Sequence, residues 1–234
     1  MSQASEHKNI EKLVIAVDGP SASGKGTVSR EVAKALGLTW IDTGALYRVV
    51  ALLGQREGVP LNSGESLARL VESSDITLTW GNSGTSITVD GEEFSGLIRT
   101  EIVGQGASAV AKQPAVRKAL LALQREMASN GGVVMDGRDI GSVILPAADL
   151  KIYLTASLQV RARRRYQEQL TRGVNTTYGE VESEISARDL QDMTREHAPL
   201  VQASDAFDVD TSSMTVQEAV AKIVKLAEAV VKNH

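Results

Sequence analysis

Glycines, serines and a lysine are concentrated in the stretch VDGPSASGKGT, residues 17–27. Gly19, Gly24 and Lys25 have the spacing G-x-x-x-x-G-K of a phosphate-binding loop. Glycines let the backbone wrap closely around a phosphate because no Cβ intervenes. The lysine supplies a mobile charge for the β- and γ-phosphates of ATP, so Lys25 is a predicted catalytic residue. The predicted ATP-binding residues are Gly19, Pro20, Ser21, Ala22, Ser23, Gly24, Lys25, Gly26 and Thr27.

Oxygen ligands for Mg²⁺ are sparse in this pattern. The position after Lys25, where the motif usually carries a hydroxyl, is Gly26, and the hydroxyl follows at Thr27. Asp136 ends the apolar run VVMDG. A carboxylate there can orient Mg²⁺ through water, or it can cap the next turn. We expect Mg²⁺ to be bound together with ATP and to be held by Asp136 and Thr27 through water rather than directly.

Further arginines and carboxylates occur in short, dense patterns. The stretch DTGALYR contains Tyr47 and Arg48, and the stretch DGRD contains Arg138 and Asp139. An adjacent arginine and aspartate can form a simple surface ion pair. Their position after an apolar strand favours a ligand site, because open α/β sheets bind ligands at the carboxyl ends of their strands. Tyr47 is explained equally well by packing and by contact with a ligand.

Arg188, Asp192 and Arg195 are spaced i, i+4 and i+7, which places them on one face of a helix. Phosphoryl transfer between two nucleotides joins two polyanions, so it needs cationic side chains for the acceptor as well as a donor loop. A regulatory ATP-binding switch has no use for a second phosphate site. The arginines therefore favour an enzyme over a switch, and they leave the identity of the acceptor open.

An alternating order of strands and helices has to position these residues. Apolar runs predict strands at Leu13–Val17, Thr39–Ile41, Val133–Met135, Lys151–Leu154 and Ala206–Val209. Helical periodicity predicts helices at Gly26–Leu36, Ala45–Arg56, Glu65–Ser73, Glu101–Ala111, Pro114–Ala128, Leu158–Thr171, Glu180–Thr194 and Val216–Val231. The alternation predicts a three-layer α/β/α fold around a five-stranded parallel sheet. The phosphate loop then precedes a helix N-terminus, which attracts anions.

The stretch DITLTWGNSGTSITVDGEEF, residues 75–94, breaks this order. Apolar and polar residues alternate within it, and GNSG and DG punctuate it. Such a pattern is typical of a small antiparallel sheet. We interpret it as an insert that shapes or covers a neighbouring site and carries no chemistry of its own.

The composition narrows the class of protein. The chain has 234 residues, 42% of them hydrophobic, which suffices for one sizeable core with an insert. It has no cysteine, which excludes disulfides and thiolate metal sites. Its net charge of −4 and few aromatic residues argue against nucleic-acid binding. The polar start and the lack of an apolar run of roughly 18 residues predict no membrane partner. We expect a cytoplasmic monomer.

Several motifs, in order along the chain, resemble those of the bacterial cytidylate kinases, which are nucleoside monophosphate kinases of the P-loop class. They are GPSASGKGT, DTGALYR, IRT, MDGRDIG and REHAPL. The phosphate loop alone indicates only a very large superfamily, whereas DTGALYR and DGRDIG at this spacing are specific. The resemblance implies transfer of the γ-phosphoryl group of ATP to CMP or dCMP, giving ADP and CDP or dCDP, with magnesium.

The resemblance also implies roles for single residues. Arg48, Arg138 and Arg195 join Lys25 as catalytic residues. Arg188 and Asp192 are expected on the ribose side of CMP, and Ser108 and Arg117 in the cytosine pocket. The implied CMP-binding residues are Thr43, Tyr47, Arg48, Ser108, Arg117, Arg138, Asp139, Arg188, Asp192 and Arg195.

The resemblance also implies a division of the chain into domains. A loosely ordered or disordered segment at 1–12 precedes a single domain at 13–234, which contains an NMP-binding insert at about 43–112 and a helical lid at about 158–197. A lid that closes over the phosphates excludes water and so prevents hydrolysis of ATP. The lid carries the arginine cluster 161–165, in which Arg164 and Arg165 are candidates for ATP contacts.

Overall fold

The computed structural model describes residues 9–81 and 84–232 of the chain. The chain divides into two compact units, one formed by the residues up to Leu38 together with those from Gly131 onward, and the other by Thr39–Asn130. The second unit extends past the insert expected at 43–112, because the helices α3 (Gly64–Ser73) and α5 (Pro114–Ala128) pack against each other. Much of the segment expected to be loosely ordered lies outside the described residues, but Ile10–Lys12 form a 3₁₀ helix.

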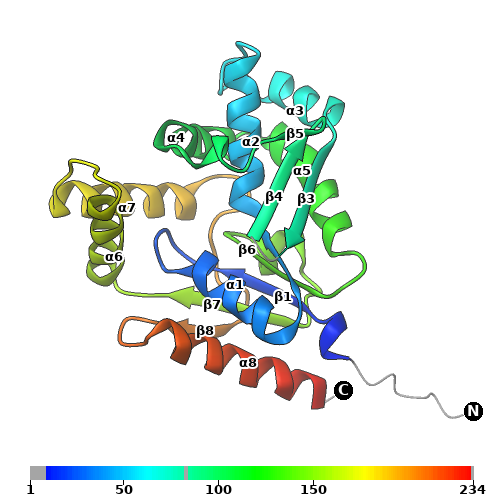
Figure 1. Ribbon diagram of the computed structural model, residues 1–234, viewed down its shortest axis with the longest axis vertical. Coiled ribbons are helices and arrows are strands. Elements are labelled where there is room, and N and C mark those ends of the chain that lie inside the picture. Colours follow the sequence, from blue (N-terminus) through cyan, green and yellow to red (C-terminus); the bar gives the residue numbers. More distant parts are fainter. Residues whose placement is uncertain (1–8, 82–83, 233–234) are drawn as a thin grey trace, which may run out of the picture. The chain divides into compact units, whose positions relative to one another are not determined.

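A five-stranded sheet has the strand order β2-β6-β1-β7-β8 (Figure 1). Strand β1 runs parallel to β6 and β7, and β7 runs parallel to β8. Ile15, Ala16 and Val17 of the central strand are apolar and buried, as expected for a parallel strand that is covered on both faces. The predicted α/β fold with a five-stranded parallel sheet is confirmed. The strand bounds are β1 Val14–Asp18, β2 Thr39–Asp42, β6 Val133–Gly137, β7 Leu150–Thr155 and β8 Phe207–Asp210.

The register of the parallel strands brings carboxylates to one edge of the sheet. Val17 lies opposite Asp136, and Asp18 lies opposite Gly137 on one side and Tyr153 on the other. The chain leaves β1 and β6 at this same edge. The phosphate loop after β1 and the DGRD turn after β6 are therefore neighbours, at the edge where α/β sheets bind ligands.

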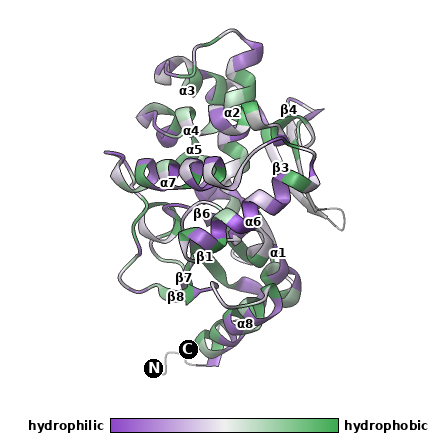
Figure 2. Ribbon diagram, turned by 90° about the vertical axis from the view of Figure 1, so that its left-hand side faces the viewer, coloured by the Kyte–Doolittle hydropathy of each residue, from purple (hydrophilic) through white to green (hydrophobic). Residues whose placement is uncertain are grey.

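Among the described residues, four α-helices belong to the first unit. Helices α1 and α8 pack against each other, as do α6 and α7 (Figure 1). Helix α8 buries Ala219, Ile223 and Ala227, one residue in each turn, and Figure 2 shows hydrophobic and hydrophilic residues alternating along it. Helix α7 begins before the predicted Glu180, because Thr177 and Glu180 form a capping box. The helix bounds are α1 Lys25–Leu36, α6 Leu158–Thr171, α7 Tyr178–Thr194 and α8 Val216–Lys232.

The second unit has its own core, formed by helices and a small antiparallel sheet. Helix α2 (Thr43–Arg56) packs against α4 (Glu101–Val110) and α3, and its residues Leu46, Val49 and Val50 are fully buried. The sheet has the order β3-β4-β5, which confirms the antiparallel insert expected at 75–94. The strand bounds are β3 Ile76–Gly81, β4 Gly84–Val89 and β5 Glu92–Glu93.

Two local features complete the fold. The turn between β4 and β5 places Asp90 and Gly91 at positive φ, as a two-residue hairpin with the sequence Asp-Gly requires. A π-helix at Ile140–Ile144 follows the DGRD turn, and the sequence pattern did not predict it. Within the described part of the chain, no helix is long and apolar enough to cross a membrane.

Candidate active site

The phosphate loop has the backbone that its glycines predict. Gly19 adopts a φ of 152°, and a Cβ at this position would lie 2.0 Å from the carbonyl oxygen of Leu154 on β7. Gly24 adopts a φ of 91° immediately before α1 begins at Lys25. Gly19 is required by the close approach of the loop to β7, and Gly24 by a left-handed turn into the helix. The loop thus reaches the N-terminus of α1, whose unpaired amides favour anions.

Lys25 is buried and folds back into its own loop. Its Nζ donates hydrogen bonds to the carbonyl oxygens of Gly19 and Pro20, both at 2.7 Å. Burial, together with the nearby positive charges of Arg138 and Arg188, lowers the pKa of Lys25 well below its usual value, and the carboxylates of Asp136 and Asp18 oppose this shift only in part. The lysine therefore lies within the electrostatic reach of the DGRD turn and of α7.

Asp18 is a buried carboxylate that the sequence analysis missed. Its two oxygens accept hydrogen bonds from the amides of Ile140 and Gly141, both at 2.7 Å. The residue thereby ties the end of β1 to the π-helix that follows the DGRD turn. A signal was present in the sequence, since VDG at 17–19 repeats the strand-ending pattern of MDG at 135–137.

The environment of Asp18 sets its proton affinity. Burial raises its pKa from 3.8 to about 6, against the two amide hydrogen bonds, which lower it. The neighbouring charge of Asp139 raises the pKa further, and that of Lys25 lowers it. Asp18 therefore titrates closer to neutral pH than an exposed aspartate does.

Asp18→Asn should change how the free energy of unfolding depends on pH. The folded protein holds the proton of Asp18 more tightly than the unfolded chain does, because the folded pKa is the higher one. The resulting contribution to stability is complete below about pH 4 and is lost as the pH rises through about 6. At about 1.4 kcal/mol per pKa unit, the wild type should lose about 3 kcal/mol relative to the variant between these limits.

The measurement is urea unfolding of both proteins, followed by circular dichroism at several pH values from 4 to 7.5. A difference between wild type and Asp18→Asn that stays constant over this range would contradict the raised pKa.

A second group of charges joins the DGRD turn to α7. Arg138 donates from Nε to Asp192 at 2.8 Å, and Arg195 donates from Nη2 to Asp139 at 3.2 Å. A second nitrogen of Arg195 lies 3.9 Å from Asp192. Residues far apart in the sequence thus form one alternating chain of guanidinium and carboxylate groups. We call these residues, Arg138, Asp139, Asp192 and Arg195, the charge cluster.

The charge cluster is largely shielded from solvent. The side chains of Arg195 and Asp139 are 9% and 5% exposed, and that of Arg138 is 20% exposed. Charges with so little contact with water require partners, and each guanidinium here has a carboxylate. An anion that enters such a place meets several arginines within a medium that screens charge weakly.

Of the remaining sequence-predicted residues for CMP, Arg188 lies on α7 and the others lie in the second unit. Arg48 donates to the carbonyl oxygen of Ile98 at 3.1 Å. The guanidinium carbon of Arg117 lies 5.6 Å from the centre of the Tyr47 ring, and the Arg117 Nη1 donates to Ala111 at 3.4 Å. The ring of Tyr47 thus packs against Arg117, and contact of Tyr47 with a ligand remains a prediction. The predicted residues in this unit are Thr43, Tyr47, Arg48, Ser108 and Arg117.

The arginine cluster of α6 is divided among different partners. Arg161 bonds to Ser21 of the phosphate loop and pairs with Asp189 of α7. Arg164 donates to the carbonyl and hydroxyl oxygens of Thr211, at 2.7 and 3.1 Å. Arg165 pairs with Glu168 at 3.1 Å in an exposed position. Contacts of Arg164 and Arg165 with ATP remain predictions.

The donor set for a metal is sparse in the structure too. Among the described residues, no group of three or more histidine, cysteine, aspartate or glutamate side chains could hold a metal ion. Asp136 is buried at the end of β6 and acts electrostatically on Lys25. A single carboxylate beside a phosphate loop fits Mg²⁺, which keeps several waters and binds through one or two carboxylates and the phosphates of its substrate.

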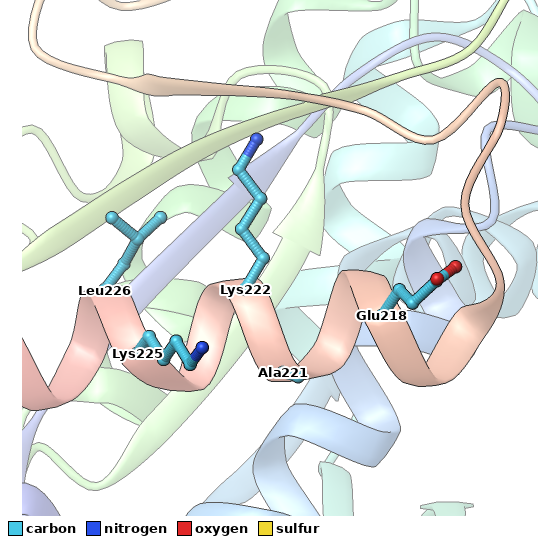
Figure 3. A pocket seen from close by; sticks show the side chains of 5 residues that line it. All are labelled: Glu218, Ala221, Lys222, Lys225 and Leu226. Atoms are coloured by element: carbon cyan, nitrogen blue, oxygen red, sulfur yellow. The ribbon is translucent and has the colours of Figure 1, made fainter.

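A hollow of about 410 Å³ lies on α8, away from these residues. Figure 3 shows its lining side chains along one stretch of the helix. They are Glu218, Ala221, Lys222, Lys225 and Leu226. Since none of them is a predicted nucleotide ligand, we do not assign the hollow to the active site.

Known proteins share sequence similarity with this chain over most of its length. A model of the cytidylate kinase family matches residues 15–229. A cytidylate kinase of an Exiguobacterium species is 44% identical over 94% of this chain and 98% of its own length. One of Pediococcus pentosaceus is 44% identical over 93% of this chain and 96% of its own.

Solved structures agree at the level of the fold. A gluconokinase from Sinorhizobium meliloti covers 95% of this chain and 95% of its own, with a TM-score of 0.50 and 17% identity. At this identity the likeness extends to the fold alone.

Proposed function

Because this chain belongs to the cytidylate kinase family, we propose that it transfers the γ-phosphoryl group of ATP to CMP or dCMP. An oxygen of the acceptor phosphate forms a bond to the γ-phosphorus. The bond from that phosphorus to the bridging oxygen of ATP breaks, and the products are ADP and CDP or dCDP. The observation that carries the proposal is the position of the charge cluster, which lies at the same edge of the sheet as the phosphate loop.

The donor nucleotide is held by the phosphate loop. Amides at the start of α1 and in the left-handed turn at Gly24 bind the phosphates. Lys25 stabilises the charge that develops on the transferring group, since transferred phosphoryl groups pass through a loose, highly charged transition state. Its hydrogen bonds to the Gly19 and Pro20 carbonyls support this role, because they hold the ammonium inside the loop.

Asp136 and Thr27 are the residues that would hold Mg²⁺, through water. The ion, when bound, neutralises charge on the β- and γ-phosphate oxygens. Asp136 also favours the charged form of Lys25. Asp136 thus contributes to binding of the donor phosphates both through Mg²⁺ and through the charge of Lys25.

The acceptor phosphate is bound by arginines, of which Arg138 and Arg195 belong to the charge cluster and Arg48 to the second unit. In the cluster, carboxylates already hold the guanidinium groups in place. Bidentate donors that are fixed in this way lose little entropy when they bind a phosphate. Arg188, whose charge lowers the pKa of Lys25, adds positive potential on the same side.

The experiment that tests the function is a coupled assay of ADP release with CMP, dCMP, UMP, AMP and shikimate, and with no acceptor. We expect rapid turnover with CMP or dCMP and slow turnover with the others. Release of ADP at one rate whatever acceptor is present would instead indicate an ATPase, and a preference for shikimate or AMP would contradict the assigned acceptor.

Asp139→Ala should reduce the preference for CMP over UMP. Cytosine presents an amino donor at C4 where uracil presents a carbonyl, and a carboxylate accepts from the first and repels the second. We propose that Asp139 reads this group, together with Arg117 and Ser108. A hydrogen bond that only one base completes contributes about 1–3 kcal/mol, so the CMP-to-UMP ratio of kcat/KM should fall about tenfold or more, mainly through CMP.

The matched control is Asp205→Ala, which removes an exposed carboxylate that pairs with Lys151. It should leave the ratio at its wild-type value. If the CMP-to-UMP ratio of kcat/KM is also unchanged in Asp139→Ala, Asp139 does not read the base, and the discrimination between the bases must come from Arg117, Ser108 or Thr43.

A further inference from the structure

A buried ion pair between α6 and α7 forms hydrogen bonds with the backbone of one residue of the phosphate loop. Asp189 of α7 accepts a hydrogen bond from the amide of Ser21 at 2.8 Å, and Arg161 of α6 donates to the carbonyl oxygen of the same residue at 2.9 Å. Arg161 also pairs with Asp189 and donates to Ala156 at 2.9 Å. Both polar groups of the Ser21 backbone are therefore bound by one pair of side chains.

The pair is almost completely removed from water. Arg161 is 7% exposed and Asp189 is 9% exposed. Buried charges are retained at low cost only where each has an opposite charge and hydrogen-bond partners. Ser21 supplies the additional partner for both charges, so the loop and the ion pair stabilise each other.

The loop needs this support because its next residue is strained. Ala22 adopts a φ of 57°, a left-handed conformation that residues other than glycine keep only where their surroundings enforce it. Its side chain packs against a small apolar cluster of α6 and α7 formed by Ala162, Val181 and Ile185. The two helices thus hold Ser21 by hydrogen bonds and Ala22 by packing.

We infer that Arg161 and Asp189 are positioning residues for the phosphate site, which hold Ser21 so that the following loop amides face the phosphates of the donor nucleotide. The guanidinium of Arg161 is directed at the loop backbone and at Asp189, so its effect on ATP passes through Ser21. A consequence is that the phosphate site depends on how α6 and α7 pack together. The inference rests on the proposed binding of ATP by this loop.

The test separates loop geometry from stability with three variants, Arg161→Met, Asp189→Leu and the double variant. Equilibrium binding of ATP and of inorganic tripolyphosphate is measured by calorimetry without acceptor, and melting temperature is measured alongside. Each single variant leaves one buried charge unpaired, so it should lower the melting temperature and weaken both ligands about ten- to a hundredfold. The double variant removes both charges and should recover part of the melting temperature that the single variants lose, because the Ser21 backbone groups still lack these two partners.

The double variant should nevertheless bind both ligands at least about tenfold more weakly than the wild type, because apolar side chains cannot bond to the amide and carbonyl of Ser21. The control for an effect of lowered stability alone is Ile223→Ala, which leaves a cavity at a fully buried position of α8. It should lower the melting temperature and leave both dissociation constants unchanged.

Wild-type affinity in the double variant would overturn the inference, and so would a loss confined to ATP with tripolyphosphate unaffected. A wild-type protein that binds neither ligand would refute the proposed ATP site, and this inference with it. If the wild type phosphorylates CMP and the double variant binds both ligands as tightly as the wild type does, only this inference is refuted and the proposed function stands.

Discussion

Lys25→Ala is expected to lower kcat about a thousandfold while the protein stays folded. The lysine stabilises charge on the transferring phosphoryl group, and loss of such a contact costs several kcal/mol of activation free energy. Its ammonium is prepared for this role, because the carboxylates of Asp18 and Asp136 favour the charged form and the loop carbonyls hold it in place. The measurement is steady-state turnover with saturating ATP and CMP.

Lys222→Ala is the matched control, since it removes an ammonium from the exposed hollow of α8. It should retain wild-type turnover. Circular dichroism and melting temperature establish that Lys25→Ala is folded. If the folded Lys25→Ala variant turns over within a few-fold of the wild-type rate, the assignment of Lys25 to the ATP site is wrong.

The second large effect is expected for Arg195→Ala, with kcat for CMP reduced about a hundredfold or more. The variant removes a guanidinium that we place on the phosphates, and it also leaves the buried carboxylate of Asp139 without the partner that now lies 3.2 Å away. Since Arg195 belongs to the charge cluster and not to the phosphate loop, the Kd for ATP should change much less than kcat. Arg48→Ala should have a smaller effect on turnover.

The comparison needs kinetics with varied CMP and a separate ATP titration. Arg172→Ala, which breaks an exposed ion pair with Glu168 on α6, serves as a control for loss of an arginine. Unchanged kinetics in both Arg195→Ala and Arg48→Ala would reject the arginine site for the acceptor. An equal loss of ATP affinity and turnover would assign Arg195 to the donor nucleotide instead.

The sequence by itself determined the order of strands and helices and the phosphate loop. These features are local, since buried strands and amphipathic helices have fixed periods and the loop motif is contiguous. The same holds for the antiparallel insert, whose Asp-Gly turn is encoded by the residues that form it. The resemblance of DTGALYR and DGRDIG to known motifs then indicated the family, which the comparisons confirm.

The tertiary structure decided which charges meet. The sequence contains Asp18 and Asp189, but nothing local shows that one accepts from the amides of Ile140 and Gly141 and the other from Ser21. It also shows Arg161 in a cluster, where the usual interpretation is a solvated face. Burial and partners depend on residues more than a hundred positions away, because the parallel sheet brings the ends of separate strands to one edge. No short pattern encodes the long-range contact through which Arg161 bonds to Ser21 of the phosphate loop.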